Sequence, residues 1–139
     1  MTDPLPLLHH VVFVIARERL DRAADYLTDL GFQFLAFDHA EFGLAIRLDW
    51  DRGFELISPL PGAPTEAGTA ADFLARHGDG LFSVVVRTAD HQASEHIAMR
   101  HGVESDFRQH VEGDGFDVKE VKLKPFFGIP LTLLETNMP

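Results

Sequence analysis

The stretch ADFLARHGDGLFSVVV, residues 71–86, contains a predicted transition from helix to strand, and this transition decides the fold. Its first residues predict a short helix, the glycines of HGDG predict a turn, and the β-branched run that follows predicts a buried strand. The preceding segment PLPGAPTEAGT, residues 59–69, is rich in Pro, Gly and Thr, as is typical of a surface connector. A strand that starts after a connector in mid-chain indicates that the fold begins a second time there.

The two halves of the chain predict the same order of elements. In the first half a β-branched strand is followed by a helix and three strands, at residues 9–15, 17–31, 32–38, 42–50 and 54–58. In the second half this order returns at residues 81–88, 90–102, 103–110, 117–124 and 128–135. FELISP, residues 54–59, corresponds to LTLLET, residues 131–136, because each follows shortly after a turn glycine. We therefore predict an internal duplication of a βαβββ unit.

The composition is that of one globular domain, with 139 residues of which 45% are hydrophobic and 24% are charged. A net charge of −10 opposes binding to nucleic acid. No apolar run approaches the roughly 20 residues that a membrane span needs. The chain has no cysteine, which excludes disulfides and thiolate metal sites. Because the N-terminal MTDPLPLL lacks the basic region and cleavage site of a signal peptide, we expect a cytoplasmic protein.

The ordered set of HHVVFVI, LGF after the first helix, FELISP and ADFLARHGDGLFSVVV resembles the vicinal oxygen chelate superfamily. This superfamily includes glyoxalase I, extradiol dioxygenases, methylmalonyl-CoA epimerase and bleomycin-resistance proteins, and the motifs are most similar to the epimerase-like and glyoxalase-like branch. The resemblance implies an α+β fold in which two βαβββ modules form one curled, eight-stranded mixed sheet with the shape of a cup. It implies a single domain over residues 1–139, with module one at 7–59, a connector and short helix at 60–78, and module two at 79–136. It also implies a homodimer.

The resemblance further implies four metal-ligand positions, one on the first strand and one on the last strand of each module. Module one has His10 and Glu55 at these positions. Module two has Ser83 and Thr132, where the family has histidine and usually glutamate. The neighbouring His9 is expected to point away from this site, because successive strand residues face opposite sides of a sheet.

Two interpretations of this site remain open. In the first, a divalent metal is bound by His10, Glu55 and Glu135, the last of which needs a bulge or a shifted register because it is three residues beyond Thr132. In the second, His10 and Glu55 form a metal-free polar pair that binds a ligand, or that acts as general base and orienting group. Open metal sites usually have three protein ligands, so we expect no tightly bound metal.

Apolar residues beside the expected site suggest the kind of ligand. Phe82, Phe126 and Phe127 lie next to the strands that line the cup in the family, and Ser83 and Thr132 offer hydroxyls to a ligand. Such a pocket suits a small, partly apolar molecule with one or two oxygens. The sequence HQASEHIAMRH places His91, His96 and His101 at intervals of five, which fans them around a helix and predicts solvated side chains.

These observations favour a small-molecule enzyme with His10 and Glu55 as catalytic residues. The reaction is expected to be a proton transfer next to a carbonyl, or a related lyase or dioxygenase step. The alternative is a non-catalytic protein that sequesters a small ligand, as drug-resistance members of the family do. A third interpretation is a pure interaction module. The partner expected in the first two cases is a small molecule, with no nucleic acid and no membrane.

Overall fold

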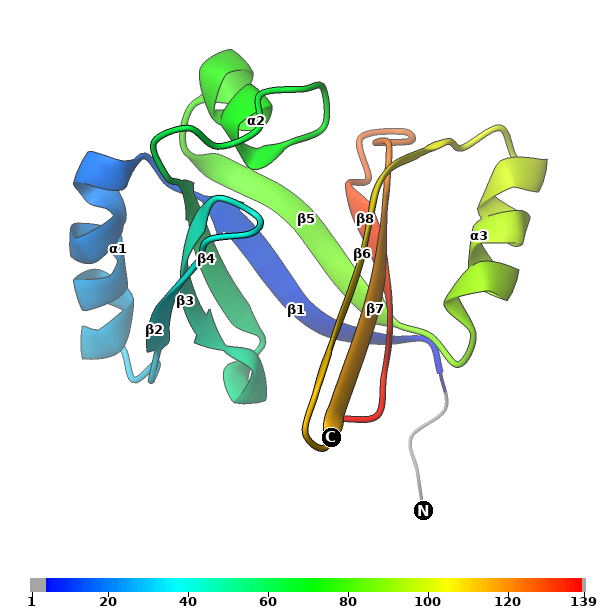
Figure 1. Cartoon of the computed structure of the whole chain (residues 1–139), viewed down its shortest axis with the longest axis horizontal. Coiled ribbons are helices and arrows are strands. Elements are labelled where there is room, and N and C mark those ends of the chain that lie inside the picture. Colours follow the sequence, from blue (N-terminus) through cyan, green and yellow to red (C-terminus); the bar gives the residue numbers. More distant parts are fainter. Residues whose placement is uncertain (1–4, 139) are drawn as a thin grey trace. The chain divides into compact units, whose positions relative to one another are not determined.

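The computed structural model describes residues 5–138, which form two compact units. One unit is His10–Phe82, and the other is the rest of the described chain. The division falls within two strands, β1 (Leu7–Val14) and β5 (Gly80–Arg87). Among the described residues there are eight strands and three α-helices, so the predicted α+β class is confirmed (Figure 1). None of the helices described is long and apolar enough to cross a bilayer.

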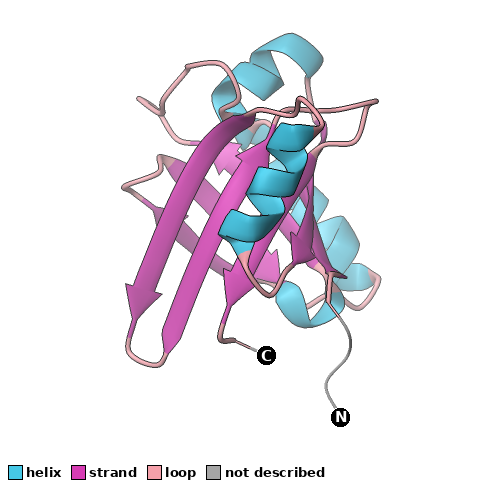
Figure 2. Ribbon diagram, turned by 90° about the vertical axis from the view of Figure 1, so that its right-hand side faces the viewer, coloured by secondary structure: helices cyan, strands magenta, loops and turns pink. Residues whose placement is uncertain are grey.

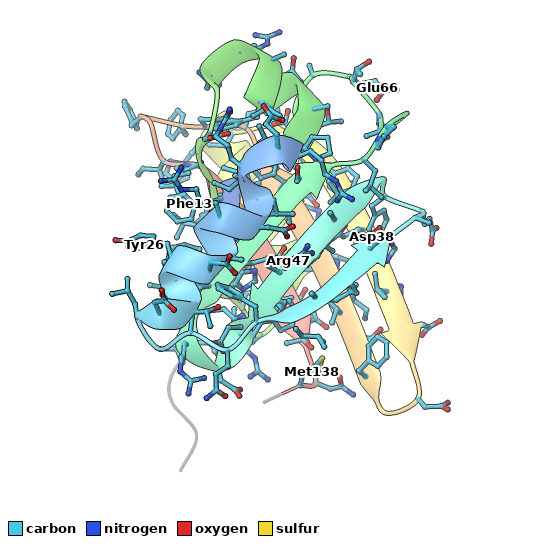
Figure 3. All side chains as sticks on the ribbon, turned by 90° about the vertical axis from the view of Figure 1, so that its left-hand side faces the viewer. Phe13, Tyr26, Asp38, Arg47, Glu66 and Met138 are labelled. Atoms are coloured by element: carbon cyan, nitrogen blue, oxygen red, sulfur yellow. The ribbon has the colours of Figure 1, made fainter. Side chains whose placement is uncertain are left out.

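The unit His10–Phe82 is built on a four-stranded mixed sheet. After β1 come α1 (Arg17–Asp29), β2 (Leu35–His39), β3 (Leu44–Asp49), the 3₁₀ turn η1 (Trp50–Arg52), β4 (Phe54–Pro59) and α2 (Ala70–His77). The strand order is β2-β3-β4-β1, in which β4 runs antiparallel to β3 and parallel to β1. In Figure 3 α1 lies over one face of this sheet, near Phe13 and Arg47.

The second unit repeats this arrangement with β5. It continues through α3 (His91–Arg100), β6 (Ser105–Gly113), β7 (Phe116–Leu123) and β8 (Leu131–Thr136). The strand order is β5-β8-β7-β6, in which β8 runs antiparallel to β7 and parallel to β5. Figure 2 shows α3 lying across one face of these strands.

Strand register supports the predicted duplication residue by residue. Val12 of β1 pairs with Glu55 of β4, and Val85 of β5 pairs with Thr132 of β8. His10 precedes Val12 by two positions, just as Ser83 precedes Val85. The structure therefore places Ser83 at the position of His10, and Thr132 at the position of Glu55, within the two repeats.

The helices α1 and α3 each cover the sheet face opposite to the one that carries these residues. In the first unit Leu20 and Ala24 of α1 pack on Ala45 and Leu56, with Phe13 beside them. Because side chains alternate along a strand, the neighbouring Glu55 lies on the other face. In the second unit the cluster under α3 consists of Val121, Leu123 and Leu133.

One polar group is out of place in this core. The Ser58 side chain is fully buried on the face of Leu56, and among the described residues its hydroxyl has no hydrogen-bond partner. An unsatisfied buried hydroxyl costs about 1–3 kcal/mol. We expect Ser58→Ala to raise the free energy of unfolding by about 1 kcal/mol in urea denaturation.

A matched control lies in the second unit. Ser83 is equally buried, but its hydroxyl is hydrogen-bonded to Pro130 and Thr132. Ser83→Ala should therefore lower the free energy of unfolding. If both variants lose stability, the Ser58 hydroxyl has a partner after all.

Candidate functional site

The residues predicted as a catalytic pair, His10 and Glu55, lie on neighbouring strands of the first unit. His10 Nε2 is 3.5 Å from Glu55 Oε1, and the two side chains are 1% and 16% exposed. The His10 imidazole is thus enclosed, whereas part of the Glu55 side chain reaches the surface. His9, the preceding residue, is only half-buried, and its pKa is lowered by burial and by the charge of Arg87.

A third residue, Trp50, completes this cluster, although it was not among the site residues predicted from the sequence. Its indole Nε1–H donates a hydrogen bond of 2.9 Å to Glu55 Oε1. Its ring also stacks on His10, with a centroid distance of 5.0 Å and an interplanar angle of 26°. It is the single tryptophan of the chain, and a half-buried indole N–H usually finds an acceptor. That signal, together with the short turn between Trp50 and Glu55, would have indicated the contact.

The 3₁₀ turn η1 explains how Trp50 reaches back to β4. Asp49 caps the turn, because its side chain accepts a hydrogen bond from the backbone N–H of Arg52. Gly53 ends the turn with a left-handed φ of 77°, a conformation that glycine adopts without strain. The chain therefore reverses within a few residues, and Trp50 and Glu55 face one another.

The environment of Glu55 changes its acidity. Burial raises the pKa of this carboxyl to about 7, and the hydrogen bond from Trp50 acts in the opposite direction. Burial dominates because a buried carboxylate loses its hydration, which favours the neutral form. At neutral pH both forms are populated, which is the condition under which a carboxyl group works best as a general base.

In the second unit the hydroxyls of Ser83 and Thr132 bind each other. Their oxygens are 2.5 Å apart, and Ser83 Oγ also donates to the carbonyl of Pro130 at 3.1 Å. Because a serine hydroxyl has one hydrogen, Thr132 is then the donor within the pair. Both side chains are buried, neutral and already hydrogen-bonded. Metals in proteins are bound mainly by imidazole, thiolate and carboxylate groups, so this pair is poorly suited to hold one.

Glu135 does not stand at the Thr132 position. Lys119 pairs with Glu135 and Lys122 with Thr132 in one continuous register, so the bulge that would have brought Glu135 to the face of Thr132 is absent from this strand pair. Glu135 Oε1 instead accepts hydrogen bonds from the backbone N–H of His91 and from its ring Nδ1, at 3.0 and 2.9 Å. These contacts with His91, with Lys119 nearby, lower the pKa of Glu135.

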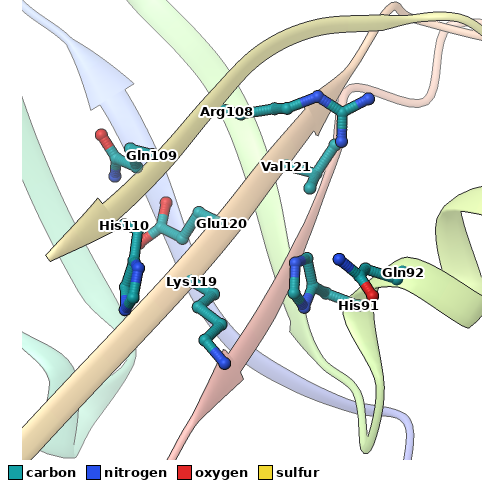
Figure 4. A pocket seen from close by; sticks show the side chains of 8 residues that line it. All are labelled: His91, Gln92, Arg108, Gln109, His110, Lys119, Glu120 and Val121. Carbon is teal, nitrogen blue, oxygen red and sulfur yellow. The ribbon is translucent and has the colours of Figure 1, made fainter.

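The expectation that His91 is solvated is therefore wrong, because its side chain is only 16% exposed and is paired with Glu135. His96 and His101 are exposed, as predicted. His91 also lines a pocket of about 430 Å³ in the second unit, where Figure 4 shows Lys119 between His91 and His110. This pocket contains none of the predicted site residues.

Two groups of side chains in this unit have the ligand types of a metal site. They are Asp90, His91 and Glu135, and His110, Glu112 and Asp117. In the first group Asp90 caps α3 through the N–H groups of Gln92 and Ala93. In the second, His110 is bound directly to Asp117. Within the described residues, side chains of both groups are already engaged in hydrogen bonds or ion pairs.

At the predicted ligand positions the first unit therefore offers two metal-ligand side chains, His10 and Glu55, and the second unit offers only two hydroxyls, so neither unit has the three protein ligands that an open metal site usually needs. We expect the purified protein to contain metal well below one equivalent, before and after chelation, by elemental analysis. Titration with iron, manganese, nickel, cobalt and zinc should give no high-affinity site that depends on His10. One equivalent of metal that disappears in both His10→Ala and Glu55→Ala would contradict this expectation.

The phenylalanines predicted to line a ligand pocket have different surroundings. Phe82 packs edge-on against Phe73 of α2, with ring centroids 5.4 Å apart. Phe126 and Phe127 lie in the loop between β7 and β8 and are 40% and 88% exposed. Phe127 also has a left-handed φ of 54°, which is uncommon for a bulky residue. A role for these residues in ligand binding stays a prediction.

No family model matches the chain. Among solved structures, the methylmalonyl-CoA epimerase of Mycobacterium tuberculosis has a TM-score of 0.67 and 22% identity, over 92% of this chain and 86% of the epimerase. A Streptomyces coelicolor methylmalonyl-CoA epimerase in complex with 2-nitronate-propionyl-CoA gives a TM-score of 0.71 at 19% identity, over 97% and 100% of the two chains. A hypothetical protein from Bacillus halodurans C-125 gives 0.73 at 18%, over 98% of each. The strand order of both units and these similarities together show that the chain has the vicinal oxygen chelate fold.

Proposed function

We propose that this protein is a small-molecule enzyme of the isomerase type, in which Glu55 moves a proton on a carbon atom next to a carbonyl. The observation that carries the proposal is the Glu55 cluster itself. It consists of a largely buried carboxyl group with a pKa of about 7, an indole N–H bound to it, and an enclosed imidazole beside it. The Glu55 side chain is partly exposed, which gives a substrate a way to approach it.

The proposed step balances without any further reactant. The Glu55 carboxylate takes the proton from the carbon next to the carbonyl, and the electrons of the broken C–H bond move onto the carbonyl oxygen. The resulting enolate is neutralised when a proton returns to carbon. Since a carboxyl proton exchanges with water, hydrogen from the solvent enters the substrate whenever the step reverses.

The substrate class is an activated carbonyl compound that has an acidic C–H bond. Related folds bind such molecules: one solved methylmalonyl-CoA epimerase holds methylmalonyl-CoA and NH4+, and its chain is 18% identical to this one. We therefore include methylmalonyl-CoA among the test compounds, together with 1,3-dicarbonyl compounds and 2-oxo acids.

Incorporation of deuterium from D₂O tests this function directly. Each compound is incubated with the wild-type protein, and deuterium at the carbon next to the carbonyl is followed by NMR and mass spectrometry. We expect catalysed exchange with at least one compound, above the rate with heat-denatured protein. Absence of catalysed exchange across the whole panel would refute the proposal.

A second candidate is a binding protein without turnover. It is favoured by the Ser83–Thr132 pair, in which both predicted ligand positions of the second unit carry neutral hydroxyls that are already bonded to each other. The probe is 2-nitronate-propionyl-CoA, an anion that resembles an enolate and is bound by the Streptomyces epimerase. Saturable binding of this probe with no exchange of any substrate would support the second candidate.

A further inference from the structure

The geometry points to Trp50 as a positioning residue that holds Glu55 by its Oε1 atom, which leaves Oε2 as the atom that exchanges a proton with the substrate. This inference rests on the proposed function and assigns the two oxygens of the base different tasks. Trp50 itself is not expected to touch the reacting carbon.

Both neighbours of Glu55 contact the same oxygen. Trp50 Nε1–H donates to Oε1 at 2.9 Å, and His10 Nε2 is 3.5 Å from that atom. Among the described residues, no donor is hydrogen-bonded to Oε2. The carboxyl group is thus fixed on one side and open on the other.

The exposure of the cluster agrees with this division. The Glu55 side chain is 16% exposed, whereas that of His10 is 1% exposed. Among the described residues, the hydroxyl of Ser58 is the only side-chain polar atom that is both buried and without a hydrogen-bond partner, so the unbonded Oε2 is not fully buried. A substrate can therefore approach Glu55 from solvent, whereas His10 is enclosed.

Trp50 has the chemistry that a positioning residue needs. An indole N–H only donates and cannot take a proton at neutral pH, so it stays bound to Oε1 whether Glu55 is ionised or neutral. Its ring is held in place by the stack on His10 and by the turn that Asp49 caps. Asp49 is 5% exposed and also accepts the backbone N–H of Gln33, which fixes the base of this turn.

The test removes the indole N–H and follows both the reaction and the carboxyl group. Trp50→Phe should lower kcat for deuterium exchange about tenfold, because an unfixed carboxyl group spends less time in reactive geometry. KM should stay within about twofold, because Trp50 is not a substrate contact. Asp51→Asn is the matched control in the same turn, since Asp51 is exposed, and it should leave both constants unchanged.

A single-atom version of the test does not depend on whether Trp50→Phe folds. Because Trp50 is the only tryptophan, its replacement by benzothienylalanine during expression exchanges N–H for sulfur at this position alone. In protein with ¹³C-labelled glutamate, the Glu55 carboxyl resonance is assigned by its loss in Glu55→Gln. We expect this resonance to shift in the substituted protein, with the other glutamate signals unchanged.

The outcomes separate the two proposals. If the wild-type protein exchanges deuterium and the loss of the N–H leaves kcat unchanged, the positioning role is wrong and the proposed function stands. If the wild-type protein exchanges nothing, the proposed function fails. Oε2 is then no proton-exchanging atom, so the inference fails with it. A tenfold lower kcat with an unchanged KM and a displaced Glu55 resonance supports both.

Discussion

Glu55→Gln is expected to lower the rate of solvent hydrogen exchange into the substrate by about 10³-fold, within the range that a general base contributes. The amide cannot take a proton at neutral pH, yet its oxygen can still accept the hydrogen bond that Trp50 donates to Glu55. The shape of the site should therefore be kept while the base is lost. The measurement is kcat for deuterium incorporation, with folding checked by circular dichroism.

The pH profile gives the same prediction a second readout. Since the pKa of Glu55 is raised to about 7 by burial, kcat should increase with pH below 7 and level off above it. Glu104→Gln is a suitable control because Glu104 is exposed and is paired with Lys124 at 2.8 Å. This control should retain the wild-type rate and profile. A Glu55→Gln variant within twofold of wild type would show that another group is the base.

Much of the fold was predictable because it rests on local patterns. β-branched runs mark β1 and β5, and alternation with turn glycines marks the three strands that follow each helix. The match of FELISP with LTLLET predicted that Thr132 corresponds to Glu55. The strand register agrees, because Glu55 pairs with Val12 and Thr132 pairs with Val85. Because the two halves repeat one pattern of strands, the alignment of one half predicts the strand register of the other.

The site was less predictable because its contacts join residues that no local pattern connects. The spacing of His91 along its helix says nothing of Glu135, which lies 44 positions away and reaches it from β8. Trp50 was overlooked because a lone aromatic residue in a turn gives no periodic signal. The possible substitution of Glu135 for Thr132 depended on a bulge, and sequence alone does not determine whether a strand pair has one.

The stability of the protein should fall as the pH rises from about 4.5 to 7, because of Glu55. The pKa of this carboxyl is 4.5 when exposed and is raised to about 7 by burial in the folded state. Between these values the folded protein binds more protons than the unfolded chain, so a higher pH favours unfolding. The stability that Glu55 gains by staying protonated is complete below pH 4.5 and is lost as the pH passes 7. The shift corresponds to an upper limit of about 3 kcal/mol.

Glu55→Gln should remove this dependence, because an amide stays neutral at every pH. Relative to wild type, we expect the variant to gain up to about 3 kcal/mol in the free energy of unfolding between pH 4.5 and 8, measured by urea denaturation. Other carboxyls such as Asp79 and Glu95, whose pKa values are lowered by Arg19 and Arg108, are present in both proteins and cancel in the difference.

The control for this measurement has the opposite sign. The hydrogen bond and charge of Lys124 lower the pKa of Glu104, so Glu104→Gln removes a contribution that is present at neutral pH and lost on acidification. Relative to wild type, the free energy of unfolding of Glu104→Gln should therefore decrease as the pH rises. Parallel curves for wild type and Glu55→Gln would mean that burial leaves Glu55 as acidic as an exposed glutamate, and a base tuned to neutral pH would then have no physical support.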